Sequence, residues 1–293
     1  MSVHDDPTFA ALRPRLFAIA YRMTGSVADA EDACQDAWLR WAAVDRASVD
    51  RPEAFLVRTV TNLSIDRLRS AQRRKETYVG PYLPEPLLAA DGGAGSDPEH
   101  AAELADSLTL AFLVLLDELS PVERAVLLLH DVFGYAFGEI APMVDRTPEA
   151  CRQVASRTRR KLARDRVELR RPDAPAEQLA IERLLHTTAT GDVEGLMAVL
   201  APDVVMVNDG GAGRHAARRP VRGSDRVARF LVNLARRMDR DQEFRVVDVN
   251  GDPGLLFARD GRADFVMVFA FGPDGRILRI WSQLNPEKLA HLG

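Results

Sequence analysis

The chain has 293 residues, of which 46% are hydrophobic and 28% charged, a composition typical of a folded protein of about two domains. The two cysteines, Cys34 and Cys151, are too few for a disulfide framework, which favours a reducing compartment and argues against a zinc site built from cysteine. No apolar run approaches the ~20 residues that span a bilayer. The N-terminal segment carries two aspartates where a signal peptide carries positive charge, so we expect a cytoplasmic protein away from membranes. We assign no metal ligand and no cofactor.

The chain has a net charge of −4 but contains two strongly basic segments. Residues 151–171 hold nine Lys or Arg against two acids, and residues 66–75 hold five against one. Such patches are typical of surfaces that contact phosphate. A solvated helix face with internal ion pairs gives the same composition, and charge alone does not separate the two interpretations.

Residues 8–75 have the periodicity of helices. Ser26 and Asp29 form a start that resembles a capping box, and apolar residues recur behind it at helical spacing. Four polar side chains lie off this apolar stripe: Asp29, Asp32, Gln35 and Asp36. Pro52 begins a second helix. Its polar face contains Arg58, Asn62, Asp66, Arg69 and Arg73, at steps of three or four residues.

Residues 76–103 are expected to be a linker, because they contain four prolines and four glycines and show no hydrophobic periodicity of a helix or strand. The segment is also acidic. Its first part, YVGPYLPEPLL, is too aromatic and apolar for a simple spacer. We therefore expect this part to pack against another surface.

Residues 104–171 return to helix, with Ser120 and Pro121 at one helix start. A short helix over 137–144, a turn over 145–147 and a longer helix from residue 148 have helix-turn-helix proportions. The longer helix has a small apolar face. Five side chains on its other faces can contact bases or phosphates: Arg152, Gln153, Ser156, Arg157 and Arg160. Their presence together favours DNA binding over a merely solvated face.

Residues 176–293 differ from the preceding helical segments, because their pattern predicts strands as well as helices. Helices are expected over 176–190 and 192–200, and a third begins at Ser224, which we expect to cap it. Strands are expected over 204–207, 244–249, 255–258, 265–271 and 276–284. Helices followed by antiparallel strands predict a separate α+β domain.

Four segments resemble regions 2 and 4 of extracytoplasmic-function (ECF) sigma factors of bacterial RNA polymerase. They are DAEDACQDAWLRW (29–41), PEAFLVRTVTNLSIDRLR (52–69), LSPVERAVLLLHDVFGYAFGEIA (119–141) and TPEACRQVASRTRRKL (147–162). The tail, above all TGDVEGLMAVLAPDVV (190–205), is similar to SnoaL-like domains of the nuclear-transport-factor-2-like cone. The combination resembles the SigJ-type subgroup, together with YVGPYLPEP (78–86), DGGAG (209–213) and NPEKL (285–289).

This resemblance implies a multidomain fold: a region 2 helical bundle over 8–75, a linker, a region 4 helix-turn-helix over 104–171, and an α+β cone over 176–293. The partners it implies are core RNA polymerase and promoter DNA. The acidic residues around Asp32 would bind the clamp helices of the polymerase. The face around Arg58 would follow the single strand at the downstream element, with a base pocket expected in loop 46–51. The helix around Arg157 would bind the upstream element in the major groove.

The resemblance also implies that the C-terminal domain modulates the sigma part in cis. The residues we assign to this regulation are Tyr82, Asp209, Gly210, Gly211 and Asn285. Whether the tail activates or inhibits is left open, as is an unidentified small ligand in the cone.

Three alternatives remain. The cone domain can be an enzyme, with Asp209, His215 or Asp264 as acid or base, although a turn, an exposed loop and a strand end account for them more simply. A ligand-sensing regulator that binds duplex DNA without polymerase would have no use for the region 2 segments. A redox pair of Cys34 and Cys151 is less expected than two small buried residues.

Overall fold

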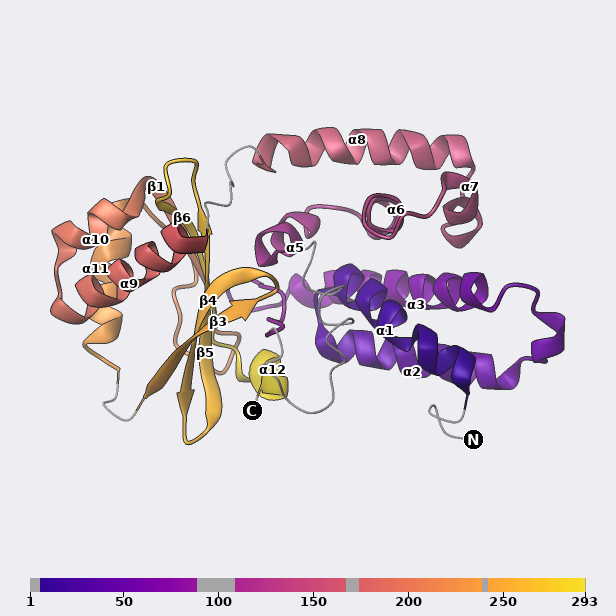
Figure 1. The fold of residues 1–293 in the computed structure, drawn as a ribbon, viewed down its shortest axis with the longest axis horizontal. Helices are drawn as coiled ribbons and strands as arrows, with labels where there is room; N and C mark the ends of the chain where they lie inside the picture. The colour runs from indigo at the N-terminus through magenta and orange to yellow at the C-terminus, as the bar shows by residue number, and fades with distance from the viewer. Residues whose placement is uncertain (1–5, 89–108, 167–173, 239–241, 293) are drawn as a thin grey trace. The chain divides into compact units, whose positions relative to one another are not determined.

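The computed structural model describes residues 6–88, 109–166, 174–238 and 242–292, and these form two compact units. Unit 1 is helical and is built from the chain up to Thr77 together with Phe112–Arg164. Unit 2 holds the α+β tail and also residues 78–88 (Figure 1). The expectations for residues 89–108 and 167–171 lie outside the described residues.

Unit 1 begins with three helices that pack against one another. Ser26 accepts a hydrogen bond from the backbone N–H of Asp29 at 3.1 Å, which confirms the expected cap, because the hydroxyl satisfies a free N–H of the first turn. Trp41 and Leu56 are buried between the helices. The elements are α1 (Pro7–Thr24), α2 (Val27–Ala43), the 3-10 helix η2 (Arg46–Ser48) and α3 (Pro52–Lys75).

The second helical segment of the chain contains the expected helix-turn-helix. Ser120 and Glu123 form a full capping box at the start of α6. The short helix expected over 137–144 is one helical turn followed by a 3-10 turn, and Asp145 reverses the chain with a φ of 54°. The elements are α5 (Leu110–Leu116), α6 (Pro121–Asp131), α7 (Phe137–Ile140), η3 (Ala141–Met143) and α8 (Pro148–Arg166).

A buried arginine joins α6 to the first three helices. Arg124 is 3% exposed and donates to the carbonyl oxygen of Met23 and to a carboxylate oxygen of Asp117, both at 2.7 Å. Lys75 Nζ binds the second Asp117 oxygen at 2.7 Å. Burial raises the pKa of Asp117, but the Arg124 and Lys75 charges outweigh it and hold that pKa below its usual value. Lys75, part of the basic segment 66–75, therefore belongs to an internal ion pair.

Unit 2 differs from the expectation in three places. The helix expected to be capped by Ser224 has Gly223 at its N-cap, and Ser224 makes no side-chain cap. A short strand, β2, was not expected, and β1 is parallel to β6, so the sheet is mixed. The elements are α9 (Ala174–Thr190), α10 (Val193–Val199), β1 (Leu200–Asp209), β2 (Val221–Arg222), α11 (Ser224–Ala235), β3 (Glu243–Val249), β4 (Asp252–Arg259), β5 (Arg262–Phe271), β6 (Ile277–Gln283), α12 (Pro286–Leu289) and η4 (Ala290–Leu292).

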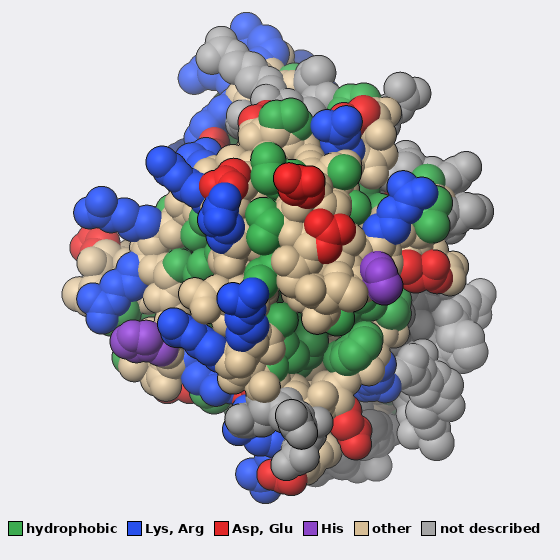
Figure 2. Space-filling model, turned by 90° about the vertical axis from the view of Figure 1, so that its left-hand side faces the viewer, with side chains coloured by type: hydrophobic (Ala, Val, Ile, Leu, Met, Phe, Trp, Pro, Cys, Tyr) green, Lys and Arg blue, Asp and Glu red, His purple; other side chains and the backbone are tan. Residues whose placement is uncertain are grey.

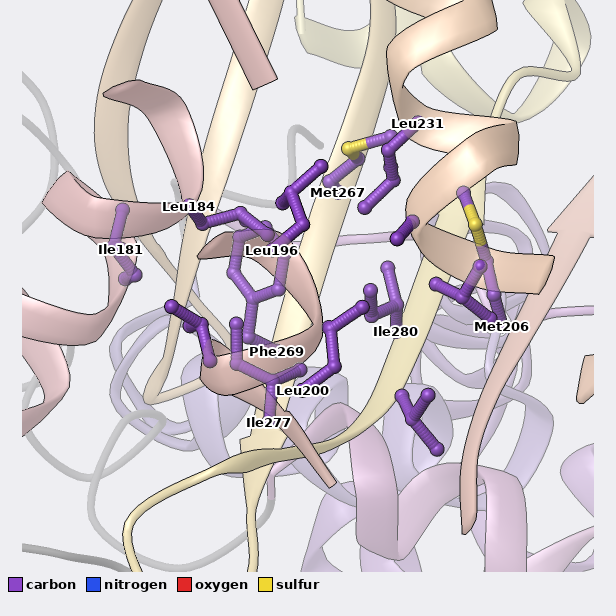
Figure 3. Packing of buried hydrophobic residues seen from close by; sticks show 14 of the residues in the cluster. Ile181, Leu184, Leu196, Leu200, Met206, Leu231, Met267, Phe269, Ile277 and Ile280 are labelled. Atoms are coloured by element: carbon purple, nitrogen blue, oxygen red, sulfur yellow. The ribbon is translucent and has the colours of Figure 1, made fainter. Parts of the chain in front are cut away.

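The core of unit 2 lies between its sheet and three helices. The sheet has the order β2-β1-β6-β5-β4-β3, and α9, α10 and α11 cover one face of it (Figure 1). Alternate strand residues such as Met206, Met267 and Ile280 point into the same layer as Leu184 and Leu231 from the helices (Figure 3). This burial of one sheet face gives unit 2 a hydrophobic core of its own.

The helical side of unit 2 has a mixed surface. Seen from that side, Lys and Arg side chains predominate over the left-hand part of the view, with a few acidic and apolar side chains between them (Figure 2). Within the described part of the chain, no helix has both the length and the apolar character needed to cross a membrane.

Candidate functional site

The α8 polar face consists of Arg152, Gln153, Ser156, Arg157 and Arg160. All five side chains are exposed, while Cys151 and Ala155 on the same helix are fully buried. Burial of the apolar face of α8 within unit 1 fixes the rotation of the helix, which is why these side chains are presented together. Arg152 pairs with Glu149 at 3.2 Å, an exposed contact that contributes little stability. Arg159, by contrast, is held by two hydrogen bonds to Asp131.

The side chains of the predicted α3 face differ in their exposure and in their partners. Arg58 is exposed and lines a cleft of about 760 Å³ in unit 1, and Asn62 is half-buried. Arg69 is exposed and pairs with Asp66 at 3.2 Å. Arg73 lies in α3, but its side chain is outside the described part. The base pocket expected in loop 46–51 stays a prediction.

The α2 acidic face consists of Asp29, Asp32, Gln35 and Asp36. Asp32 and Gln35 are exposed, and Asp29 and Asp36 are half-buried. Asp36 is bound by Arg67 of α3 at 2.7 Å. Leu39, one turn further along α2, is 58% exposed, an apolar side chain beside acids that the sequence pattern does not distinguish from a core leucine. A face that combines carboxylates with an exposed leucine suits a basic protein partner better than phosphates.

The Asp209 cluster of unit 2 consists of Tyr78, Tyr82, Asp209, Gln283, Asn285 and Lys288. Asp209 is 0% exposed, and its Oδ2 accepts from Lys288 Nζ at 2.7 Å and from the backbone N–H of Leu83 at 2.8 Å. Its Oδ1 accepts from the Tyr78 hydroxyl at 2.5 Å. Burial and the neighbouring Asp209 raise the pKa of Tyr78 above its usual value, so the phenol remains the donor. The buried carboxylate thus has a charge partner and hydrogen bonds at both oxygens.

Aromatic rings and glycines complete the Asp209 cluster. Lys288 Nζ lies 3.2 Å from the ring centroid of Tyr82 and 4.9 Å from that of Tyr78, within the range of a cation–π interaction. Gly211 has a φ of 55°, and a Cβ there would lie 2.7 Å from Asn285 Nδ2. A Cβ on Gly210 would lie 2.8 Å from the Arg214 carbonyl oxygen. Gly211 therefore permits close approach of the loop to Asn285 of the cluster, whereas Gly210 permits the loop to fold back closely on its own residues.

Residues 78–88 are held along their length within unit 2. Beyond the Asp209 cluster, His291 Nε2 contacts the carbonyl oxygen of Pro86 at 2.8 Å. Leu87 and Asn250 exchange hydrogen bonds: Leu87 N donates to Asn250 Oδ1, and the Asn250 backbone N–H donates to the carbonyl oxygen of Leu87. Leu83 is 2% exposed. The expectation that this apolar segment packs against another surface is confirmed.

The three acid–base candidates do not meet. Asp209 is engaged in its cluster, and His215 is exposed. Asp264 pairs with Arg214 and accepts from Gln242 at 2.7 Å. Among the residues that the structure describes, no group of three His, Cys, Asp or Glu side chains could hold a metal ion.

Both cysteines are buried thiols. Burial raises the pKa of Cys34 to about 12 and also raises that of Cys151. Thiolate formation is therefore suppressed, as for small core residues and unlike reactive cysteines.

Three members of the Asp209 cluster were not singled out from the sequence. Tyr78 and Lys288 lie within the YVGPYLPEP and NPEKL motifs, whereas Gln283 belongs to neither. A signal for Lys288 was present: it is one of three lysines in the chain, and a buried carboxylate requires a cationic partner. Nothing in the sequence pattern identified Gln283.

Three stretches of the chain match protein families in the expected order: residues 8–74 match Sigma-70 region 2, residues 109–162 match Sigma-70 region 4, and residues 181–280 match the SnoaL-like domain. The chain is 38% identical to the ECF RNA polymerase sigma factor SigJ of Mycobacterium tuberculosis, over 96% of this chain and 91% of that protein. It is 33% identical to the probable ECF RNA polymerase sigma factor SigI of that organism, over 78% and 76%. The crystal structure of M. tuberculosis SigJ superimposes with a TM-score of 0.75 at 34% identity, covering 99% of this chain and 98% of that one.

Proposed function

Because the chain belongs to the ECF RNA polymerase sigma factors and serves promoter-specific transcription initiation, we propose that separate surfaces divide this task. The α8 polar face binds the upstream promoter element, the α3 face around Arg58 binds the downstream element, and the α2 acidic face binds core polymerase. The Asp209 cluster anchors the linker to the C-terminal domain and so regulates the sigma part in cis.

The exposed α8 polar face carries the upstream assignment. Arg and Gln side chains on a helix that follows a tight turn can form paired hydrogen bonds to base edges in the major groove. Arg152→Ala, Gln153→Ala and Arg157→Ala should each weaken discrimination of the upstream element by about 1–3 kcal/mol. Fluorescence anisotropy with promoter DNA and reconstituted holoenzyme measures this loss, against a promoter with a scrambled upstream element.

Arg229→Ala is the matched control, since Arg229 is an exposed arginine on α11 that pairs with Asp225 at 2.9 Å. It removes the same charge outside the α8 polar face and should leave promoter discrimination unchanged. The α8 variants should also keep wild-type affinity for core polymerase. Unchanged discrimination in all three α8 variants would contradict the assignment.

The downstream assignment is supported by the exposure of Arg58 and Arg69 on one side of α3. A basic groove along a helix suits the backbone of an unpaired strand. Asn62, half-buried between them, offers an amide rather than a stacking ring. We therefore expect the α3 face to contribute backbone contacts, whose loss lowers the salt dependence of open-complex formation.

Regulation in cis is supported by how the linker is held. Lys75 ends α3 only three residues before Tyr78, the first linker residue of the Asp209 cluster. With residues 78–88 anchored, the remaining chain to Leu110 can span only about 70 Å even when fully extended. Docking of the linker thus limits how far regions 2 and 4 can separate, and its release removes that limit.

Tyr82→Ala tests this anchor. Losing the ring beside Lys288 removes about 1–2 kcal/mol of cation–π stabilisation, which raises the population with an undocked linker about tenfold. We expect faster proteolysis within 78–88 and altered promoter output in transcription with purified core polymerase. Tyr82→Phe, which keeps the ring beside Lys288, should retain the cation–π contact and undock less than Tyr82→Ala. If Tyr82→Ala and deletion of residues 285–293 both match wild type in transcription, the C-terminal domain has no such role.

A further inference from the structure

Beside the Asp209 cluster, unit 2 contains a polar cleft of about 480 Å³. Linker residues 79–81 form one wall of this cleft, and the loop of residues 210–218, which joins β1 to β2, forms the other. The two walls approach closely: a Cβ on Gly80, whose φ is 82°, would lie 3.7 Å from the Cα of Arg218. The cleft is therefore complete only while the linker is docked.

No acidic side chain lines the cleft, whereas three basic ones do: Arg214, His215 and Arg218. Arg214 is paired with Asp264. Arg218 is exposed and has no acidic partner in the part of the chain that the structure describes. Asp209, which lies next to the loop in sequence, already has its charge neutralised by Lys288. The cleft thus offers an uncompensated guanidinium group to an anion.

A buried amide beside the cleft also lacks a partner. Asn208 lines the cleft from the end of β1 and is 3% exposed. Its Nδ2 makes no hydrogen bond within the described residues, an arrangement that is uncommon for a buried polar atom and calls for a partner outside the chain. Because the last torsion of an asparagine side chain is soft, the amide can turn its N–H groups toward a guest in the cleft.

The loop wall is built largely from residues with little or no side chain: Gly210, Gly211, Ala212, Gly213, Ala216 and Ala217. Such a wall leaves the peptide groups of the loop within reach of a ligand. Successive backbone N–H groups in turns of this kind are effective donors to anions.

We propose that this cleft binds a small polyanion carrying phosphate or carboxylate groups, held between the docked linker and the 210–218 loop. Arg218 forms paired, charge-assisted hydrogen bonds to one oxyanion group, and Asn208 adds a neutral donor. The volume lies in the range of sites for small molecules rather than single ions. Binding does not depend on the promoter and polymerase assignments; an effect of the anion on transcription would rest on the proposed regulation in cis.

Pyrophosphate and citrate are the probes for the test, because they separate phosphate from carboxylate recognition. Isothermal titration calorimetry uses the full-length chain at low ionic strength, with neither polymerase nor DNA present. We expect saturable binding of at least one probe with a dissociation constant of about 1 mM or tighter, and weaker binding as salt is added. In a protein labelled with ¹⁵N-asparagine, the side-chain resonance of Asn208 should shift on saturation.

Arg218→Ala should weaken this binding at least about tenfold, because a charge-assisted hydrogen bond is lost. Arg218→Lys, which keeps the charge but not the planar fork, should fall between this variant and wild type. Arg219→Ala is the matched control: Arg219 is the next residue, is exposed and does not line the cleft. It removes the same charge and should stay within about threefold of the wild-type affinity, since an exposed charge outside the site is screened.

The docked linker gives a second readout. A ligand that needs both walls stabilises the docked state, so pyrophosphate or citrate should slow proteolysis within residues 78–88 in wild type and not in Arg218→Ala.

The absence of saturable binding of both probes would overturn the proposal. Equal weakening by Arg218→Ala and Arg219→Ala would also overturn it, because that result indicates diffuse attraction rather than a site. So would Arg218-dependent binding of duplex DNA of random sequence without binding of either probe, which would make the loop a nucleic-acid contact. Because the titrations with pyrophosphate and citrate involve neither promoter nor polymerase, their failure would leave the assignments of the three sigma surfaces untouched.

Discussion

Replacing Asp209 with alanine is expected to destabilise unit 2 by about 3–5 kcal/mol, the usual cost of leaving a buried charge without its partner. The substitution removes the acceptor shared by Lys288, Tyr78 and the backbone of Leu83. Lys288 would remain in a site where it is only 6% exposed. Scanning calorimetry of the full chain measures the loss as a lower unfolding temperature of unit 2.

Two further variants separate this effect from the loss of any carboxylate. Asp225→Ala also breaks an ion pair, with Arg229, but that pair is exposed and its loss should cost less than about 1 kcal/mol. The double variant Asp209→Leu with Lys288→Met should recover much of the stability, because no unpaired charge stays buried. An Asp209→Ala protein as stable as Asp225→Ala would show that the cluster does not hold unit 2 together.

Charge reversal on the α2 acidic face should abolish binding to core polymerase. In Asp32→Arg with Asp36→Arg, carboxylates that attract a basic partner become repulsive, and like charges across an interface cost several kcal/mol. An affinity at least about a hundredfold lower is therefore expected. Co-purification with core polymerase and surface plasmon resonance measure the loss.

Folding should survive this change, because the Asp36–Arg67 pair is partly exposed and contributes at most about 1 kcal/mol. Circular dichroism checks the fold. Glu182→Arg with Glu194→Arg is the control, since both are exposed acids of unit 2 and give the same change in net charge. Wild-type core binding by the α2 double variant would rule out this face as the polymerase contact.

Local patterns predicted most of the helices and their starts. Ser26 and Ser120 were identified as caps because capping depends only on residues within one turn. Ser224 was assigned the same role, but Gly223 occupies the N-cap, a difference of one residue that propensity alone does not decide. The parallel pairing of β1 with β6 was missed, because pairing joins segments about 70 residues apart and leaves no local periodicity.

Residue patterns alone predict the order of the domains, the polar face of α8 and the three motifs in and around the tail. Helical periodicity and family motifs are both contained in short stretches of sequence, so they can be recognised without the tertiary structure. The pairing of Asp209 with Lys288 and of Lys75 with Asp117 is visible only in the folded structure. Both pairs join side chains that are distant in the sequence but share a buried volume, where an ionised group requires a partner.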